Sequence, residues 1–263
     1  MESPNLLSLT NLTKSFGGVA AVNDVSFDVE RGSIMGLIGP NGAGKTTVFN
    51  LITGNYHPDS GQIRFDGQDI AGMRTNRIVS LGIARTFQTI RLFQNMSALE
   101  NVLAGCHCRM RSGIIAAMLR LPRQRREERE AVEIAAAELD FVGLRRHLDS
   151  AARNFSYGNQ RLLEIARALA TRPRFLILDE PAGGMNDYET QLLVRTISQI
   201  RDRGITVLLI EHDMNLVMKI CEKITVLDHG VMIAEGNPEE IQNDRNVIDA
   251  YLGSPDNNEN EGF

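Results

Sequence analysis

The sequence has no excess of basic residues, no long apolar run and few cysteines, and each absence excludes a class of protein. Its 28 lysines and arginines are outnumbered by 33 acidic residues, which gives a formal net charge of −5. This balance argues against a general nucleic-acid binder, which must neutralise phosphates. No segment has the roughly 20 consecutive apolar residues of a membrane-spanning helix, and residues 1–13 do not resemble a signal peptide. We therefore expect a cytoplasmic protein with only peripheral membrane contacts.

The three cysteines, Cys106, Cys108 and Cys221, are too few for a disulfide framework. In a reducing compartment they are expected to be free thiols. Cys106-His107-Cys108 places possible ligands together, but structural zinc sites take four ligands from two spaced pairs. No zinc site is predicted.

Composition and length favour one α/β domain with a helical insertion. The chain has 263 residues, of which 43% are hydrophobic and 23% charged, as in ordinary globular proteins. We predict a single domain over residues 1–253, with an inserted helical subdomain over 89–160, and a polar, disordered tail over 254–263.

Alternating segments near the N-terminus predict an antiparallel sheet. Leu7-Ser8-Leu9 and residues 25–29 alternate apolar and polar side chains, and turns are expected at Gly17-Gly18 and Arg31-Gly32. Residues 34–38 are almost wholly apolar, which is typical of a strand buried on both faces.

Strands and helices alternate later in the chain, as in a parallel α/β sheet. Strands are predicted over residues 175–178, 205–210 and 224–227, and a hairpin turn at Asp228-His229-Gly230 leads into residues 231–233. The segment from Thr89 to Arg153 is expected to be helical. Within it we predict a helix from Glu127 to Leu139, whose apolar stripe is Ala131, Ile134, Ala135 and Leu139.

A glycine-rich loop follows the buried strand and precedes a helix predicted from about Lys45 to Gly54. The loop fits the pattern GxxxxGK[ST], in which backbone N–H groups and a helix N-terminus bind phosphate oxygens. Lys45 is expected to reach the β- and γ-phosphates, and the Thr46 hydroxyl to bind Mg²⁺. The loop residues are Gly39, Pro40, Asn41, Gly42, Ala43, Gly44, Lys45 and Thr46.

Two adjacent carboxylates end the apolar strand at 175–178. Asp179 is placed to hold the Mg²⁺ shell, and Glu180 to orient an attacking water. Acidic residues after a strand often only solvate a loop, but together with the phosphate loop they indicate nucleotide hydrolysis.

A second polar turn, Phe155-Ser156-Tyr157-Gly158-Asn159, precedes a helix and is a second candidate anion site. Two such sites on one chain indicate that each serves a different nucleotide in a dimer. The apolar face of this helix is predicted to be Leu162, Ile165, Ala166 and Leu169.

With these motifs in order over residues 6–253, the chain resembles the nucleotide-binding subunits of ABC transporters. The resemblance implies an ABC-type P-loop fold with a mixed sheet core, an N-terminal antiparallel β-subdomain and an inserted helical subdomain. It also implies that ATP and Mg²⁺ are bound and ATP is hydrolysed. The site residues it adds are Phe16 against adenine, Thr47 after the loop, the Q-loop Gln88 as catalytic and Mg²⁺ contact, the signature Ser156, Tyr157, Gly158 and Asn159 acting in trans, Asn186 of the D-loop, and the switch His212.

Two motifs depart from the common family pattern. The signature usually reads LSGGQ, whereas Tyr157 here replaces the first glycine and Asn159 the glutamine. The D-loop usually ends in Asp, whereas Asn186 stands here. Ser156 and Gly158 are kept, so phosphate contact is still expected.

Within that family, the chain resembles the larger ATPase subunit of branched-chain amino acid importers. The similar segments are Arg85–Phe93, the Ser-Tyr-Gly signature, Glu211–Met218 and Gly236–Gly253. The resemblance implies a dimer with a second, different ATPase, two transmembrane permeases and an external binding protein, at the cytoplasmic face of the membrane. Alternatives are another cargo (urea, an amide or an exported lipid), a non-transport ABC ATPase, or an ATP sensor.

The predicted insertion is locally basic. We expect its arginines to form a solvated helical face balanced by Glu127, Glu128 and Glu130; contact with lipid headgroups or a permease is the alternative. His107, His147 and His229 show no partner in the sequence, so no chemistry is assigned to them. The arginines are Arg109, Arg111, Arg120, Arg123, Arg125, Arg126 and Arg129.

Overall fold

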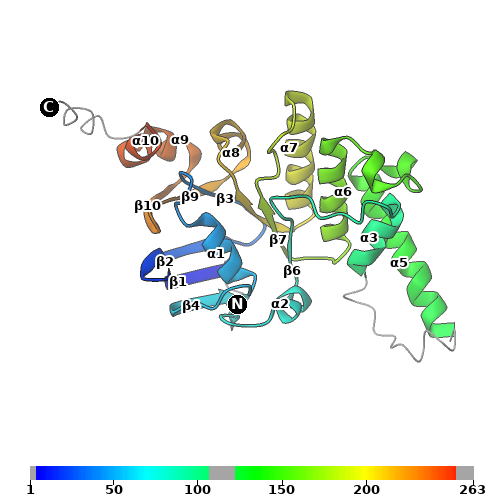
Figure 1. The fold of residues 1–263 in the computed structure, drawn as a ribbon, viewed down its shortest axis with the longest axis horizontal. Helices are drawn as coiled ribbons and strands as arrows, with labels where there is room; N and C mark the ends of the chain where they lie inside the picture. The colour runs from blue at the N-terminus through cyan, green and yellow to red at the C-terminus, as the bar shows by residue number, and fades with distance from the viewer. Residues whose placement is uncertain (1–3, 107–121, 253–263) are drawn as a thin grey trace. The chain divides into compact units, whose positions relative to one another are not determined.

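The computed structural model describes residues 4–106 and 122–252 (Figure 1). The chain divides into two compact units, Met1–Thr75 with Thr206–Phe263, and Asn76–Ile205. Each unit has its own sheet strands and helices.

The first unit contains an antiparallel sheet in the strand order β2-β1-β4-β5 (Figure 1). The predicted alternation places Leu7, Leu9, Val25 and Val29 in the core, and the chain turns at Gly17-Gly18 as expected. Both strands are longer than predicted because register shifts between β1 and β2 interrupt the simple alternation. The strands are β1 (Asn5–Phe16), β2 (Val19–Glu30), β4 (Ser60–Phe65) and β5 (Gln68–Asp69).

A second, mixed sheet in the same unit carries the phosphate loop. Strand β3 (Ile34–Ile38) is buried at every residue and pairs in parallel with β8 (Thr206–Ile210) and β9 (Lys223–Asp228). Strand β10 (Val231–Gly236) runs antiparallel to β9 after the predicted turn. Parallel pairing on both sides of β3 explains its uninterrupted apolar sequence.

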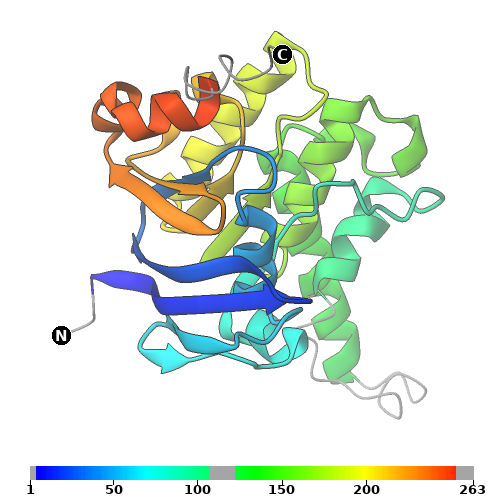
Figure 2. The same cartoon turned by 60° about the vertical axis from the view of Figure 1, so that its left-hand side comes forward.

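Four helices complete the first unit. In Figure 2, α9 and α10 lie beside the β9–β10 hairpin. Helix α9 begins at a capping box in which Asn237 and Glu240 each accept a backbone N–H of the other. The helices are α1 (Lys45–Ile52), α8 (Met214–Ile220), α9 (Pro238–Asn243) and α10 (Arg245–Leu252).

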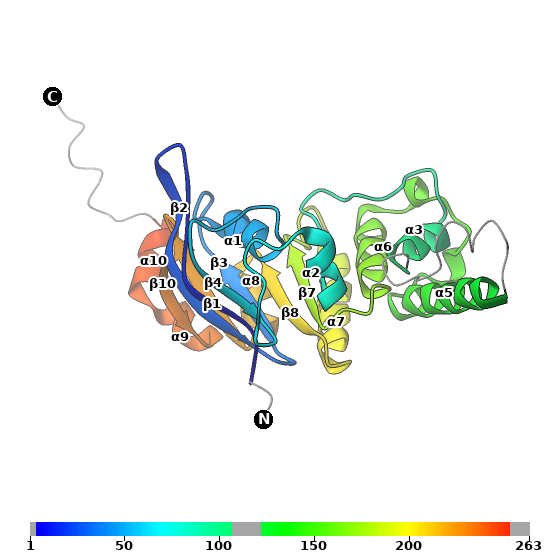
Figure 3. The ribbon, with the colours of Figure 1, turned by 90° about the horizontal axis from the view of Figure 1, so that it is seen from below.

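The second unit pairs two parallel strands, β6 (Ile83–Arg85) and β7 (Phe175–Asp179), and is otherwise mainly helical. In Figure 3, α5 runs beside α3 and α6, with which it packs. The helices are α2 (Thr75–Leu81), α3 (Ala98–Cys106), α5 (Pro122–Phe141), α6 (Tyr157–Leu169) and α7 (Asp187–Asp202), with short 3-10 turns at Arg145–His147 and Ala152–Asn154.

The prediction for α5 is confirmed and extended toward the N-terminus. Ala131, Ala135 and Leu139 are buried and Ile134 is half-buried. The expectation that helical structure begins at Thr89 is wrong, because helix begins only at Ala98. The loop before it is held by the fully buried side chain of Asn101. This amide accepts the Phe93 N–H and donates to the carbonyls of Phe93, Met96 and Ser97, which supplies the backbone partners a helix would otherwise give.

Several predictions fall outside the described residues. These are the zinc question at His107-Cys108, the tail at 254–263, and the side chains of Arg109, Arg111, Arg120, Arg123 and Arg125. Within the described part, Glu130 pairs at 3.5 Å with Arg172, which lies outside the insertion's helix.

Among the described residues, Cys106 and Cys221 form no disulfide, and both are buried. Burial and the nearby Glu222 raise the pKa of Cys221 to about 12, so its thiol stays protonated. Among the described residues, no helix is long and apolar enough to cross a membrane, and no cluster of three metal-ligating side chains is present.

Candidate active site

The phosphate loop connects β3 to α1 in the first unit, and two of its glycines have no room for a side chain. A Cβ atom at Gly39 would overlap the carbonyl oxygen of Leu227, and one at Gly44 would overlap that of Ala21. Both residues also have positive φ angles, +149° and +101°. Because these close approaches are to backbone atoms, the loop path requires glycine at both positions.

Lys45 lies under this loop. It is buried, and its Nζ donates to the carbonyls of Gly39 (2.7 Å) and Pro40 (2.9 Å). In the described structure, no side chain caps α1 and no acid occupies its first turn. An uncapped helix N-terminus beside an ammonium group is well suited to bind a polyanion. The hydroxyl-bearing Thr46 is exposed and Thr47 half-buried in the first turn.

Phe16 lies at the end of β1 with 43% of its surface exposed. Its ring contacts Tyr56 edge to face, with the centroids 5.1 Å apart, and the Lys14 ammonium lies 5.5 Å from its centroid. An exposed aromatic held in this way can stack on a flat base. Sequence analysis missed Tyr56, because nothing in its loop sequence marks it as a partner of Phe16.

His212 follows β8 in a tightly held turn. The buried Glu211 carboxylate accepts the backbone N–H groups of His212 (3.0 Å) and Asp213 (3.4 Å), and Asp213 caps α8. The imidazole itself is exposed. The turn therefore fixes the backbone, and the imidazole Nδ1 lies 3.7 Å from Glu211 Oε2.

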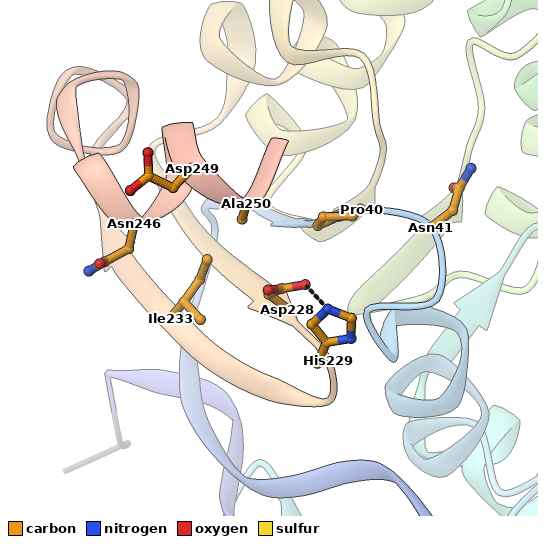
Figure 4. A pocket seen from close by; sticks show the side chains of 8 residues that line it. All are labelled: Pro40, Asn41, Asp228, His229, Ile233, Asn246, Asp249 and Ala250. Atoms are coloured by element: carbon orange, nitrogen blue, oxygen red, sulfur yellow. Dashed lines mark ion pairs between the residues drawn. The ribbon is translucent and has the colours of Figure 1, made fainter. Parts of the chain in front are cut away.

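A cleft of about 590 Å³ adjoins the phosphate loop in the first unit (Figure 4). Asp228 and His229 in it form an ion-pair contact at 3.7 Å, so His229 does have a partner. The cleft is lined by Pro40, Asn41, Asp228, His229, Ile233, Asn246, Asp249 and Ala250.

The second unit brings Gln88 and Glu180 together. The Gln88 side-chain amide donates to Glu180 Oε2 at 3.0 Å. Glu180 has a positive φ of 44°, an unfavourable backbone for this residue type and one that functional sites retain. Asp179, the residue before it, is buried, and its N–H donates to Thr86 Oγ1 at 3.4 Å. The strand end and the Q-loop are thus joined by hydrogen bonds.

The signature turn caps α6. Ser156 Oγ accepts the Asn159 N–H (3.3 Å) and donates to Glu189 Oε1 (3.2 Å). A Cβ atom at Gly158 would lie 2.5 Å from the Glu189 carboxyl carbon, so a larger residue here would require the Glu189 side chain to move. Glu189 was not predicted from the sequence; its spacing from Asn186, N-x-x-E, is a capping-box signal that could have identified it.

Asn186 is the N-cap of α7. Its side chain accepts the Glu189 N–H at 2.9 Å, and Glu189 Oε2 accepts the Asn186 N–H at 3.3 Å. The D-loop and the signature turn therefore share Glu189 as a hydrogen-bond partner. The remaining predicted residues, Tyr157 and Asn159, lie at the start of α6, Tyr157 exposed and Asn159 half-buried.

Comparison with known proteins identifies the family of the chain. The sequence pattern of the ABC transporter family matches residues 22–183, and that of the branched-chain amino acid ATP-binding cassette transporters matches residues 231–257. The chain is 48% identical to BraF of Pseudomonas aeruginosa, a high-affinity branched-chain amino acid transport ATP-binding protein, over 94% of this chain and 98% of BraF. It is 46% identical to LivG of Escherichia coli K12, also a high-affinity branched-chain amino acid transport ATP-binding protein, over 96% of this chain and 99% of LivG.

Solved structures give the same class. The crystal structure of MJ1267, an ATP-binding cassette of an ABC transporter in its ADP conformation, superposes with a TM-score of 0.83, at 31% identity, over 96% of this chain and all of that one. The chain therefore belongs to the ABC transporter family, as an ATP-binding and ATP-hydrolysing subunit. The predicted P-loop fold, with a mixed sheet, an antiparallel β-sheet and a helical insertion, is confirmed.

Proposed function

We propose that this chain energises an importer of branched-chain amino acids from the cytoplasmic face of the membrane. The observation that carries the proposal is the nearly full-length similarity to BraF and LivG, together with the C-terminal match at residues 231–257. No residue of the chain is assigned a contact with the amino acid. Cargo specificity belongs to the permeases and the external binding protein.

The phosphate loop and Phe16 form the ATP site in this proposal. The uncapped N-terminus of α1 and the buried Lys45 ammonium support phosphate binding, and the exposed Phe16 ring supports stacking on adenine. The proposed ATP-binding residues are Phe16, Gly39, Pro40, Asn41, Gly42, Ala43, Gly44, Lys45, Thr46 and Thr47.

Thr46, Asp179 and Gln88 offer the hydroxyl, carboxylate and amide oxygens that Mg²⁺ prefers, so the residues present fit this ion. When bound, Mg²⁺ supplies positive charge that offsets charge developing on the phosphate oxygens. Asp179 at the end of β7 is the proposed anionic ligand.

Glu180 is the proposed general base for the attacking water. Its hydrogen bond with Gln88 supports this role, because it orients the carboxylate directly after β7, where a base could act on a water. Lys45 and His212 bind the γ-phosphate and stabilise the charge that develops on it. Proton acceptance by Glu180 and charge stabilisation by Lys45 together account for hydrolysis.

Catalysis in this proposal requires a dimer. Ser156, Tyr157, Gly158 and Asn159 bind the nucleotide held by the facing subunit, and Asn186 contacts the same interface. The exposed Ser156 hydroxyl at the N-cap of α6 supports the proposal. We propose that the facing subunit is a second, different ATPase, and that the two subunits join two permeases and a binding protein. Residues 1–253 act as one ABC domain with the helical insertion at 89–160.

Isolation from native membranes tests this assembly. We expect a mild-detergent purification of the tagged chain to recover two polytopic membrane proteins and a second ATPase, identified by mass spectrometry. The Lys219→Ala chain, altered at an exposed residue of α8, serves as a matched bait. Recovery of a ribosome, DNA or no membrane protein would leave the ATPase assignment intact and refute the transport role.

A further inference from the structure

Helix α6 carries a buried ion pair that none of the family motifs above includes. Arg161 is fully buried and the side chain of Glu164 is 2% exposed, with Arg161 Nη1 2.9 Å from Glu164 Oε2. Burial raises the pKa of Glu164 and the Arg161 charge opposes that rise. A buried pair gains little net stability over an apolar pair of similar size. The other contacts of Arg161 and Glu164 therefore explain the role of this pair better than a contribution to stability does.

Those contacts go to the backbone of the Q-loop. Arg161 Nη1 donates to the Phe87 carbonyl at 2.6 Å and Nη2 to the Gln88 carbonyl at 2.9 Å. Glu164 Oε1 accepts the Arg91 N–H at 3.4 Å. Farther along α6, Arg167 Nη1 donates to the Arg91 carbonyl at 2.6 Å. Helix α6 thus binds main-chain atoms of Phe87, Gln88 and Arg91 in the segment that contains the Q-loop.

This segment has no regular structure of its own. Residues 86–97 form neither helix nor strand, so the planar guanidinium of Arg161 supplies donors that a sheet or helix would otherwise provide. The Phe87 ring is also held, with the Arg85 and Arg91 guanidinium carbons 4.6 and 4.5 Å from its centroid. The backbone at Phe87 and Gln88 is therefore positioned chiefly by side chains, and Arg161 donates one hydrogen bond to each of these two carbonyls.

The Gln88 side chain extends from this fixed backbone to Glu180 at 3.0 Å. Tyr157 in the first turn of α6 accepts a hydrogen bond from Arg161 Nη2 at 3.4 Å, Arg161 donates to the Gln88 carbonyl, and the Gln88 side chain continues this path to Glu180. Ser156 caps the same helix, five residues before Arg161. A change in the orientation of α6 at its signature end would be transmitted to the Gln88–Glu180 pair along this path.

We infer that Arg161 is a positioning residue for ATP hydrolysis, which couples the orientation of the signature helix to the Gln88–Glu180 pair by holding the Gln88 carbonyl. The inference rests on the role proposed for Glu180. Arg161 contacts neither nucleotide nor water in this account and acts only through Gln88.

The test compares Arg161→Met with Arg167→Met in the full-length chain, purified in its assembly with the second ATPase and the permeases. The control loses a guanidinium from the same helix and the same segment, but one that binds Arg91 rather than Gln88. We expect Arg161→Met to lower kcat about 10- to 100-fold, with the Kd for a fluorescent ATP analogue within about twofold of wild type. Arg167→Met should retain kcat within about twofold. Equal losses in the two variants would overturn the inference, since they would indicate a general structural role.

Spectroscopy provides a readout independent of turnover. In ¹⁵N-glutamine-labelled protein, the Gln88 side-chain amide is identified by its loss in Gln88→Ala. We expect this signal to move in Arg161→Met to the position it takes in Glu180→Ala, and to stay in place in Arg167→Met. An unmoved signal in Arg161→Met overturns the inference.

Two further variants distinguish an effect of Arg161→Met on folding from an effect on catalysis through Gln88. Arg161→Met removes the nearer of two ion-pair partners of the buried Glu164, with Arg167 remaining at 3.8 Å, so the double variant Arg161→Met/Glu164→Leu removes both buried charges and is measured alongside it. In a Gln88→Ala background, Arg161→Met should cause no further loss of kcat. An additive loss refutes action through Gln88. If Glu180→Gln abolishes turnover while both Arg161 variants hydrolyse ATP normally, only this inference fails and the proposed role of Glu180 stands.

Discussion

Replacing Glu180 with glutamine is expected to abolish ATP turnover while ATP binding is retained. Glutamine has nearly the same shape and its side-chain oxygen can still accept the hydrogen bond from Gln88 Nε2, now 3.0 Å from Glu180 Oε2. It has no basicity, so it cannot take a proton from the attacking water. Loss of a general base lowers kcat by roughly 10²- to 10⁴-fold. Steady-state phosphate release and equilibrium binding of an ATP analogue measure the two effects.

Asp187→Asn is the matched control for this experiment. Asp187 is an exposed carboxylate at the start of α7, seven residues after Glu180, and its replacement should leave kcat within about twofold, since surface substitutions have small effects. Near-normal hydrolysis by Glu180→Gln would remove Glu180 as the base.

Replacing Lys45 with alanine is expected to weaken ATP binding itself. The buried ammonium lies at the phosphate loop and donates to the carbonyls of Gly39 and Pro40, so it is held close to the loop atoms that bind phosphate. A hydrogen bond to a charged group contributes about 1.5–3 kcal/mol, which corresponds to a loss in affinity of roughly 10- to 150-fold. Isothermal titration with ATP measures the loss directly.

Lys219→Ala controls for the change in net charge. Lys219 is exposed in the last turn of α8 and belongs to the same unit as the phosphate loop. Its removal should leave the Kd unchanged, because exposed charges interact weakly through water. Unchanged affinity in Lys45→Ala would contradict the phosphate-loop assignment.

The sequence best predicted those elements whose burial follows a regular pattern along the chain. Residues 34–38 are apolar because β3 has strands on both sides, and the periodic apolar face of α6 is buried at each predicted position. The structure of the segment after Thr89 was predicted wrongly. Its order comes from Asn101, a single polar side chain with three backbone acceptors, and no sequence period reports such an arrangement.

In the candidate site, too, some features could be predicted from the sequence and others could not. A contiguous motif such as the phosphate loop is readable because its local backbone requires glycine at fixed spacing. Contacts between segments far apart in the chain cannot be read from the sequence in this way. Gln88 and Glu180 were each predicted, but their hydrogen bond joins residues 92 positions apart. Arg161 interrupts an apolar helix face, and sequence periodicity alone reads such a residue as solvent-facing.

The departures from the common family motifs have local partners. Tyr157, where a glycine is usual, places its ring beside Gly184, and its hydroxyl lies 3.4 Å from Arg161 Nη2. Asn186, where an aspartate is usual, still caps α7, because asparagine and aspartate are about equally good N-caps. Tyr157 and Asn186 are thus compatible with the starts of α6 and α7, where the signature and the D-loop lie.

Uptake of labelled leucine by cells that lack this chain tests the central claim most directly. We expect the wild-type chain to restore uptake and Glu180→Gln to leave it absent, although the variant is present at the membrane and binds ATP. Uptake restored equally by both, or by neither while both assemble at the membrane, would contradict the account that ATP hydrolysis by this chain drives branched-chain amino acid import.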